Sequence, residues 1–319
     1  METVLSDRTL WALVLAILAL LGLVAFFAVA TFLLRIKNER EALVWDRLKR
    51  TWEPGLLEAL ADPERLPALW ETVEEENELQ FLEFVLRYAQ RLKSTERDVL
   101  RKAAAPFIPK ILPDLKHRQM GKRARTVQTL GILGLPAFVD DLKASIYDSS
   151  PFVAAMAARL LAHEVGAEIA PDLCKSLDRF HNFRTWYLVD MMVAMGPGAI
   201  PSIRGTLANP KMPDRTRAVA AHALSVLWDL ESGGLAAKLL REEKNAEFLT
   251  SLLRLLGQVG TPEHLPAVRT HLDSQEFFVR AAATRTLSEL GTEKDLPLLV
   301  EKLGDPSSWV KMAAARGIY

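Results

Sequence analysis

Histidine and cysteine carry metal-binding and nucleophilic chemistry, and this chain of 319 residues has few of them. It holds six histidines and one cysteine, Cys174. No two histidines stand three or four positions apart, the spacing that places two ring nitrogens on one helix face for a shared metal ion. The nearest pair, His264 and His271, would lie about 10 Å apart along a helix. We therefore expect no metal centre and no disulfide.

Other catalytic patterns are also missing from the sequence. Cys174 lies in an apolar helical pattern near Leu173 and Leu177, which favours a small buried side chain over a nucleophile. We find no glycine-rich phosphate loop, no nucleophile elbow and no paired catalytic carboxylates. The sequence thus predicts a protein that is not an enzyme and that needs no cofactor.

The charged residues are balanced overall, with 40 basic and 40 acidic side chains and a net charge of 0. A nucleic-acid-binding protein usually has a basic excess, so we expect no nucleic acid partner. One local basic cluster lies at the start of the repeats described below, and its residues are Lys116, Arg118, Lys122, Arg123 and Arg125. A solvated helix face explains this cluster most simply. An acidic partner or anionic lipid headgroups are the functional alternatives, whereas Asp140, Asp141 and Asp148 interrupt any longer basic stripe.

A membrane anchor is the clearest feature of the N-terminal region. Residues 10–34 carry no charge, and 25 helical residues span about 37 Å, enough to cross a hydrocarbon core of about 30 Å. A cleaved signal peptide is the alternative, but it needs a basic leader, and Glu2 and Asp7 accompany Arg8 here. Apolar residues also continue beyond the small-residue motif at 28–30. We therefore expect an uncleaved, single-pass transmembrane helix.

Cations flank the apolar segment on one side only, which predicts its orientation. One side-chain cation, Arg8, precedes the segment. Six cations follow it within sixteen residues, beginning with Arg35, Lys37 and Arg40. Because positive flanks stay in the cytoplasm, we expect residues 1–34 to form a short external N-terminus and the membrane helix. Residues 35–55 then form a basic juxtamembrane segment, and we expect Trp52-Glu53-Pro54-Gly55 to break its helix.

The remainder of the chain is predicted to be helical throughout. Residues 56–120 form a divergent helical or capping region with an acidic stretch. Residues 121–319 repeat about every 31 residues, with helix-ending glycines at 134, 166, 196, 260 and 291, and with Trp228 in the glycine position of one unit. A proline begins the following helix in most units, where its missing amide hydrogen is not needed. Such helix pairs bury their faces only by stacking, so the sequence predicts an all-α solenoid behind a single transmembrane helix.

The repeat unit resembles the short bacterial HEAT repeats, also called PBS-lyase HEAT-like repeats. Asp273 to Gly291, followed by Leu-Pro-Leu-Leu at 296–299, carries the resemblance most fully. The whole layout, including Trp52-Glu53-Pro54, is similar to bacterial membrane-anchored HEAT-repeat proteins. That similarity implies the bacterial cytoplasmic membrane, with the solenoid inside. It also implies a scaffold that binds another membrane-bound protein, namely an envelope glycosyltransferase.

In this family the second helix of each pair normally lines the concave face, which implies where a partner binds. The exposed polar candidates on those helices are Asp172, Lys175, Asp178, Arg204, Lys238, Arg241 and Arg269. Two other functions remain open from the same resemblance. One is an enzyme or chaperone of the phycobilin-lyase type, which pigment binding would reveal. The other is a HEAT-like nucleic-acid-binding module, which salt-dependent DNA binding would reveal.

Two local expectations concern the last repeats. Asp273 and Arg280 are predicted to pair across a repeat boundary. The final helix, from Ser307, is predicted to expose Trp309, Val310 and Ile318, because a solenoid end needs a polar cap. We therefore expect this helix to fray, or the natural chain to continue beyond Tyr319.

Overall fold

The computed structural model describes residues 7–92 and 95–318, apart from the side chains of 7–10, 37, 38, 41 and 95. Within these ranges the chain is made of helices and turns, with no strand. It divides into two compact units. The first comprises Met1–Tyr88 and Leu92–Ala103, and the second comprises Ala89–Arg91 and Ala104–Tyr319. The all-α class predicted from the repeat pattern is confirmed.

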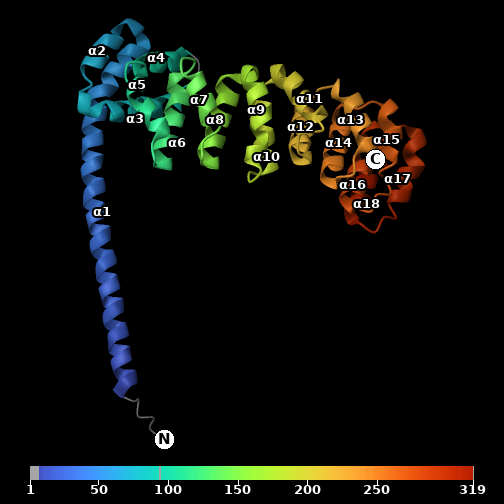
Figure 1. Cartoon of the computed structure of the whole chain (residues 1–319), viewed down its shortest axis with the longest axis horizontal. Coiled ribbons are helices and arrows are strands. Elements are labelled where there is room, and N and C mark those ends of the chain that lie inside the picture. The colour runs from blue at the N-terminus through green and yellow to red at the C-terminus, as the bar shows by residue number, and fades with distance from the viewer. Residues whose placement is uncertain (1–6, 93–94, 319) are drawn as a thin grey trace. The chain divides into compact units, whose positions relative to one another are not determined.

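Helix α1 (Asp7–Ala61) is 55 residues long and contains the apolar segment. Residues Trp11–Ile36 have a mean hydropathy of 3.0, and none of the apolar stretch is buried inside the protein. By length and composition this segment can cross a membrane. The helix continues past it for another 25 residues to Ala61. The predicted limits at residues 34 and 55 therefore fall inside one helix (Figure 1).

The expected helix break at Trp52-Glu53-Pro54-Gly55 is wrong, because tertiary contacts hold the helix together there. Trp52 is 1% exposed and packs edge-on against Phe81, with ring centroids 5.3 Å apart. The Trp52 indole donates a hydrogen bond to the Thr72 carbonyl at 3.3 Å, and Glu53 accepts one from the Tyr88 hydroxyl at 2.5 Å. The free energy gained by burying this cluster exceeds the cost of the helical hydrogen bond that Pro54 cannot donate.

Short helices surround this part of α1 in the first unit. They are η1 (Pro63–Arg65), α2 (Leu66–Glu71), η2 (Glu75–Asn77), α3 (Glu78–Ala89) and α4 (Thr95–Ala104). Leu66 and Leu69 of α2 are buried, and Leu69 lies so close to Gly55 that a Cβ there would approach its Cδ1 to 3.2 Å. The Trp70 indole donates to the Ala103 carbonyl at 3.0 Å, which ties α2 to α4. The Trp-Glu-Pro-Gly sequence is thus a packing centre.

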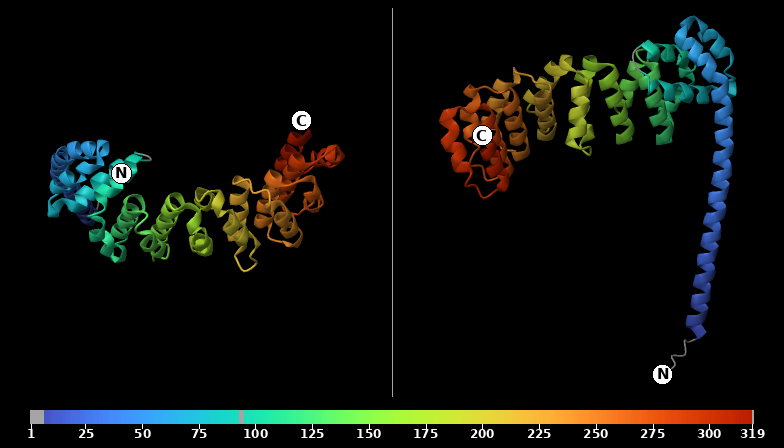
Figure 2. Two further views of the ribbon diagram at one scale, coloured as in Figure 1. Left: turned by 90° about the horizontal axis from the view of Figure 1, so that it is seen from above. Right: turned by 180° about the vertical axis from the view of Figure 1, so that it is seen from behind.

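The second unit begins with two short helical segments, α5 (Ile108–Ile111) and η3 (Leu112–Lys116), and continues as helix pairs. Figures 1 and 2 show these pairs in one row from α6 to α18. The first helices of the pairs are α6 (Met120–Thr129, continued by the π-helical η4, Leu130–Gly134), α8 (Pro151–Glu164), α10 (Thr185–Ala194), α12 (Asp214–Val226), α14 (Ala246–Val259), α16 (Phe277–Leu290) and α18 (Ser308–Ile318). The second helices are α7 (Val139–Ser145), α9 (Ala170–Ser176), α11 (Ile200–Ala208), α13 (Ser232–Glu242), α15 (Leu265–Arg269) and α17 (Leu296–Lys302). Each first helix packs on the next, from α6 to α18, which is the stacking expected of a solenoid.

Prolines and small residues explain this local structure. Prolines occupy the first turn of α9, α11, α15 and α17, as the repeat pattern predicts. Short 3-10 turns precede or extend several of these helices, namely η5 (Gly166–Ile169), η6 (Leu177–Phe180), η7 (Pro197–Ala199), η8 (Pro262–His264) and η9 (Glu293–Asp295). Buried alanines let the first helices approach one another closely, for example Ala154 and Ala158 of α8 and Ala221 of α12.

The helix-ending glycines take a left-handed backbone conformation in only part of the array. Gly166 and Gly196 have φ of 73° and 78°, and Trp228 takes the same backbone region with φ of 56°. Gly260 and Gly291 lie outside it, at φ of −73° and −65°. Those two glycines are required by space instead, because a Cβ at either would come within 2.4 Å of a carbonyl oxygen of the preceding turn.

The last helix is only partly as expected. Trp309 is 61% exposed and Ile318 is 38% exposed. Val310 was expected to be exposed, which is wrong: it is fully buried, because α18 packs against both α16 and α17. Whether this helix frays stays a prediction.

Candidate interaction surfaces

The second helices carry the residues predicted to contact a partner, and the structure separates these residues into two groups. Lys175, Asp178, Lys238 and Arg241 are exposed. Asp172 is half-buried and lies 3.6 Å from Lys143 of the preceding second helix. The exposed members lie on α9, on the 3-10 turn η6 (Leu177–Phe180) and on α13. They remain candidates for contact.

Arg204 and Arg269 instead hold neighbouring repeats together. Arg204 Nη2 donates to Asp229 Oδ1 at 2.6 Å, and its Nε donates to the other carboxylate oxygen at 2.9 Å. Arg269 donates twice to Asp295 Oδ1, at 2.6 and 3.0 Å. The Asp229 and Asp295 side chains are 6% and 2% exposed. These two arginines are therefore engaged in structural ion pairs between successive repeats.

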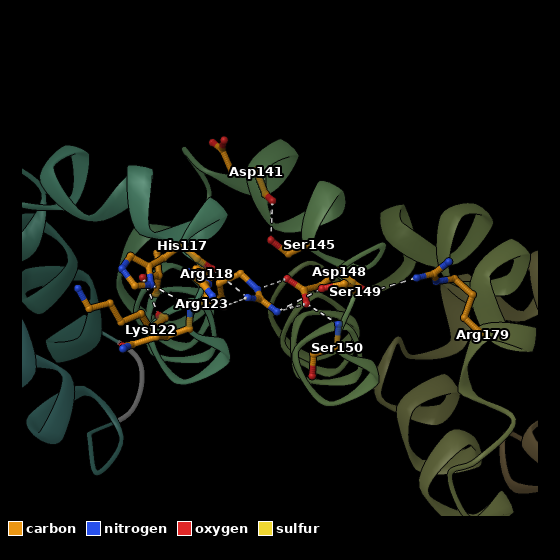
Figure 3. Close-up of polar contacts among 12 residues, drawn as sticks. His117, Arg118, Lys122, Arg123, Asp141, Ser145, Asp148, Ser149, Ser150 and Arg179 are labelled. Carbon is orange, nitrogen blue, oxygen red and sulfur yellow. Dashed lines mark hydrogen bonds and ion pairs between the residues drawn. The ribbon is translucent and has the colours of Figure 1, made fainter.

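The basic cluster divides in the same way. Lys116, Arg118, Lys122 and Arg125 are exposed, whereas the Arg123 side chain is 12% exposed. Figure 3 shows Arg123 reaching toward Asp148 while Lys122 points away. Arg123 donates to both Asp148 oxygens at 2.8 and 3.0 Å, and to the His117 carbonyl at 2.9 Å. Four of the five cations are free of this contact, so the cluster is smaller than the sequence indicates.

Arg280 repeats the arrangement of Arg123 further along the array. It donates to Asp305 at 2.8 and 3.1 Å and to the Ser274 carbonyl at 2.8 Å. The expected pair between Asp273 and Arg280 is therefore wrong, since Asp273 pairs with Lys302 at 2.5 Å. The arginine lies beside the turn that opens its own helix, so its guanidinium points to the aspartate of the next polar turn, 25 residues on.

These ion pairs keep the aspartates ionised. Burial opposes ionisation of Asp148 and Asp229, but hydrogen bonds outweigh it, and the pKa of both carboxyls lies below the ordinary value. The Arg280 hydrogen bond is the main cause of the lowered pKa of Asp305. Asp295 likewise has a lowered pKa, because the backbone amide of Thr292 and the side chain of Arg269 outweigh its burial. We call the ion pairs of these four aspartates with Arg123, Arg204, Arg269 and Arg280 the ladder, and it holds the repeats together.

Cys174 is buried, as the sequence predicts. Burial raises the pKa of its thiol, which lowers the thiolate fraction that a nucleophile needs. His264 accepts a hydrogen bond from the Thr261 amide in a capping turn, and the His271 ring lies 3.0 Å from the Leu240 carbonyl. In the described ranges, no three His, Cys, Asp or Glu side chains gather in a way that could hold a metal ion.

A groove lies on the first-helix side of the last repeats, which sequence reasoning missed. Its volume is about 530 Å³, and α14, α16 and α18 line it. Trp309, Met312 and Phe278 supply its bulky apolar surface, and Arg254, Arg285 and Arg316 supply its positive charge. These arginines follow one another at intervals of 31 residues. That interval is visible in the sequence, but by itself it does not show that the three side chains line one groove.

The relation to known proteins rests on this part of the array. Residues 235–318, from α13 to α18, match the family of HEAT repeats. These residues make up about a quarter of the chain and are similar to HEAT repeats, and we call them the HEAT array. No curated protein matches the chain. HEAT repeats generally mediate contacts between proteins, so the exposed residues of the HEAT array and its groove are best understood as interaction surfaces.

Proposed function

We propose that this protein is a membrane-anchored scaffold of the bacterial cytoplasmic membrane, which uses its HEAT array to bind another membrane-bound protein. The observation that carries the proposal is the joining of two features in one chain. Residues 11–36 form an apolar helix that the protein leaves uncovered, and a solenoid with HEAT repeats follows it. Similarity to bacterial membrane-anchored HEAT-repeat proteins favours an envelope glycosyltransferase as the partner.

The anchor is supported by the exposure of its side chains. A core helix of a soluble protein would bury large apolar residues, whereas Trp11, Leu15, Phe26 and Phe32 are each more than 60% exposed. A hydrocarbon phase would cover this surface at a gain of about 25 cal/mol per Å². We place the N-terminus outside and the array in the cytoplasm, because cations follow the segment.

The cations that set this orientation are partly neutralised. Arg35 donates to Glu39 at 2.9 Å, one turn away on α1, and Arg50 lies 2.6 Å from Asp46. Arg40 is exposed, and the Lys37 side chain lies outside the described residues. Because the orientation rule counts Lys and Arg rather than net charge, these pairs leave the expected topology unchanged.

Membrane anchoring suits a scaffold that binds weakly. Confining both proteins to one membrane raises their effective concentration, so a modest contact gives a stable complex. The exposed charges of α9 and α13, including Lys238 and Arg241, are the proposed contacts on the second helices.

Topology is tested with reporter fusions at the C-terminus. Green fluorescent protein at that end is expected to fluoresce and alkaline phosphatase to be inactive, as for a cytoplasmic position. Active phosphatase would overturn the orientation. Exchanging Arg35 and Arg40 for glutamine is expected to weaken the preference for a cytoplasmic C-terminus. The same change at Lys102 and Lys294 serves as the control.

Partner binding is tested by quantitative co-purification from detergent. The pair Lys238→Glu and Arg241→Glu is expected to lower recovery of a co-purifying membrane protein, with thermal stability unchanged. A matched control reverses two other exposed cations, Lys102→Glu and Lys294→Glu. Turnover of a small substrate that Cys174→Ala abolishes would contradict the scaffold function.

A further inference from the structure

The groove of the HEAT array has two chemically different levels. Its apolar level, which lies nearer the N-terminal ends of the helices, carries Phe278, Trp309 and Met312. One to two turns further along, an arginine stands on each helix: Arg254 on α14, Arg285 on α16 and Arg316 on α18. Four residues separate Met312 from Arg316 and seven separate Trp309 from it, which is about 6 to 10 Å along a helix.

The apolar level can accept a bulky side chain. Trp309 and Met312 are 61% and 44% exposed, so the protein itself leaves a large part of their surface open. Ala281, Ala282 and Ala313 also line the groove. Their small side chains leave room for an inserted group, and exposed tryptophan is the residue type that most often dominates binding energy at interfaces.

The arginine level carries excess positive charge. Arg285 pairs with Glu289 at 2.9 Å, while Arg254 and Arg316 have no ion-pair partner among the residues that the structure describes. Burial lowers the pKa of His222 on the preceding first helix, α12, and the Arg254 charge adds to that effect. Three arginines against Glu289 leave the groove at +2, although the chain as a whole is neutral.

The ladder that holds the repeats together does not use these arginines. The inter-repeat pairs described above involve Arg123, Arg204, Arg269 and Arg280. The three groove arginines occupy equivalent positions on stacked helices, and they therefore form a row. Neighbouring helix axes lie about 8–10 Å apart, which sets the approximate spacing of the row.

We propose that this groove binds an extended acidic peptide segment of a partner protein, with a bulky apolar residue two positions from a carboxylate. A chain in the polyproline II conformation has three residues per turn and advances about 3.1 Å per residue, so every third side chain points the same way at a spacing of about 9 Å. A carboxylate at every third residue thus matches the arginine row, and an apolar side chain at an intervening position points to a different side of the peptide, toward the level of Trp309 and Met312. The inference rests on the scaffold function and specifies its partner chemistry.

Charge and shape favour a peptide over single-stranded nucleic acid. Nucleic acid binding without sequence preference uses a long basic channel and a series of stacked aromatic side chains. This groove has a net charge of +2, and only two aromatic side chains, Phe278 and Trp309, are among the described residues that line it. A short acidic and apolar segment satisfies both levels.

Glu289 limits affinity in this arrangement. Its carboxylate extends across α14, where a Cβ at Gly257 would lie within 2.1 Å of Glu289 Oε2. Gly257 therefore gives Glu289 the space to reach Arg285 and to compete with a ligand carboxylate. Removing the Glu289 charge is expected to strengthen ligand binding.

The test uses the full chain in detergent micelles with a phage-displayed library of random dodecapeptides as the probe. Selected peptides are synthesised, and their affinity is measured by fluorescence polarisation. We expect enriched sequences to combine aspartate or glutamate with a large apolar residue. We expect Arg254→Gln with Arg316→Gln to weaken binding about tenfold, and Glu289→Gln to strengthen it about threefold.

A matched control removes two exposed cations from a second helix, Lys238→Gln with Arg241→Gln, and should leave peptide affinity within about twofold. Trp309→Ala should weaken binding with an unchanged far-UV circular dichroism spectrum, because that side chain is mostly exposed.

Several outcomes overturn the proposal. They are an absence of enriched peptides, enrichment of neutral or basic peptides, and equal peptide binding by the groove variants and the control variant. Arginine-dependent binding of a 20-nucleotide oligothymidine that is tighter than binding of the peptides would also overturn it. Co-purification of the membrane partner is measured separately. A protein that keeps its partner but binds no acidic peptide contradicts only the groove assignment, whereas a protein that binds the peptides but recovers no partner contradicts only the scaffold function.

Discussion

Trp228 gives the sharpest test of how the repeat turns are built. Its backbone is left-handed, with φ of 56°, because α12 ends in a turn where the Asp229 amide donates to the Leu224 carbonyl at 3.1 Å. A non-glycine residue in this region costs about 1–2 kcal/mol. The side chain is 64% exposed, so truncating it removes little packing. Trp228→Gly is therefore expected to be more stable than Trp228→Ala.

The magnitude follows from two opposing effects. Glycine relieves about 1–2 kcal/mol of backbone strain, but its greater freedom in the unfolded chain offsets about 0.4–1 kcal/mol of that gain. The net difference between the glycine and alanine variants is about 1 kcal/mol, equivalent to about a fivefold change in an opening equilibrium. Both variants lack the indole, so their comparison isolates the backbone contribution.

Hydrogen exchange of the α12 and α13 amides is the appropriate assay, since repeat arrays do not unfold as a single unit and exchange reports local opening. Gly196→Ala is the reverse control. Gly196 has φ of 78° and open space where a Cβ would lie, so only strain can act, and exchange in α10 and α11 should be about fivefold faster. Equal exchange in the two Trp228 variants would refute a strained left-handed backbone at this turn.

Three further predictions follow from the ion pairs and from the anchor helix. Asp229→Ala leaves two donors of the Arg204 guanidinium without their acceptor and is expected to destabilise the neighbouring repeats by about 1–3 kcal/mol, measured by hydrogen exchange in α11 and α13. The control, Glu58→Ala, removes an exposed pair with Arg65 and should cost less than about 1 kcal/mol. Acidification should destabilise the array, because the pKa values of Asp148, Asp229, Asp295 and Asp305 are lowered in the folded protein and the unfolded chain therefore binds more protons. The stabilisation is complete above the ordinary carboxyl pKa of about 3.9 and is lost as the pH falls through the folded pKa values. A thermal midpoint that is constant from pH 5 down to pH 2 would contradict this prediction. A fragment of residues 36–319 should keep the helical circular dichroism spectrum and thermal midpoint of the full chain, since none of the apolar stretch of α1 is buried among the residues that the structure describes while Trp52 remains packed; loss of its cooperative melting transition would show that the anchor contributes to the fold.

The sequence alone determined the class and order of the architecture. An uncharged stretch of 25 residues and a 31-residue period of glycine and proline are local signals, since each depends on backbone geometry or solvation within a few turns. The burial of Cys174 was also readable, because an apolar helical pattern surrounds it. These features needed no knowledge of which residues meet across the fold.

Only the tertiary structure decided which charges are free and where the helices end. Pro54 reads locally as a break, but the burial of Trp52 keeps α1 continuous, since tertiary packing exceeds a local propensity. Arg204 and Arg269 look like exposed contacts in the sequence, and only the three-dimensional spacing of the repeats reveals their aspartate partners. For the same reason the groove is visible only when three helices, each carrying one arginine, are placed side by side.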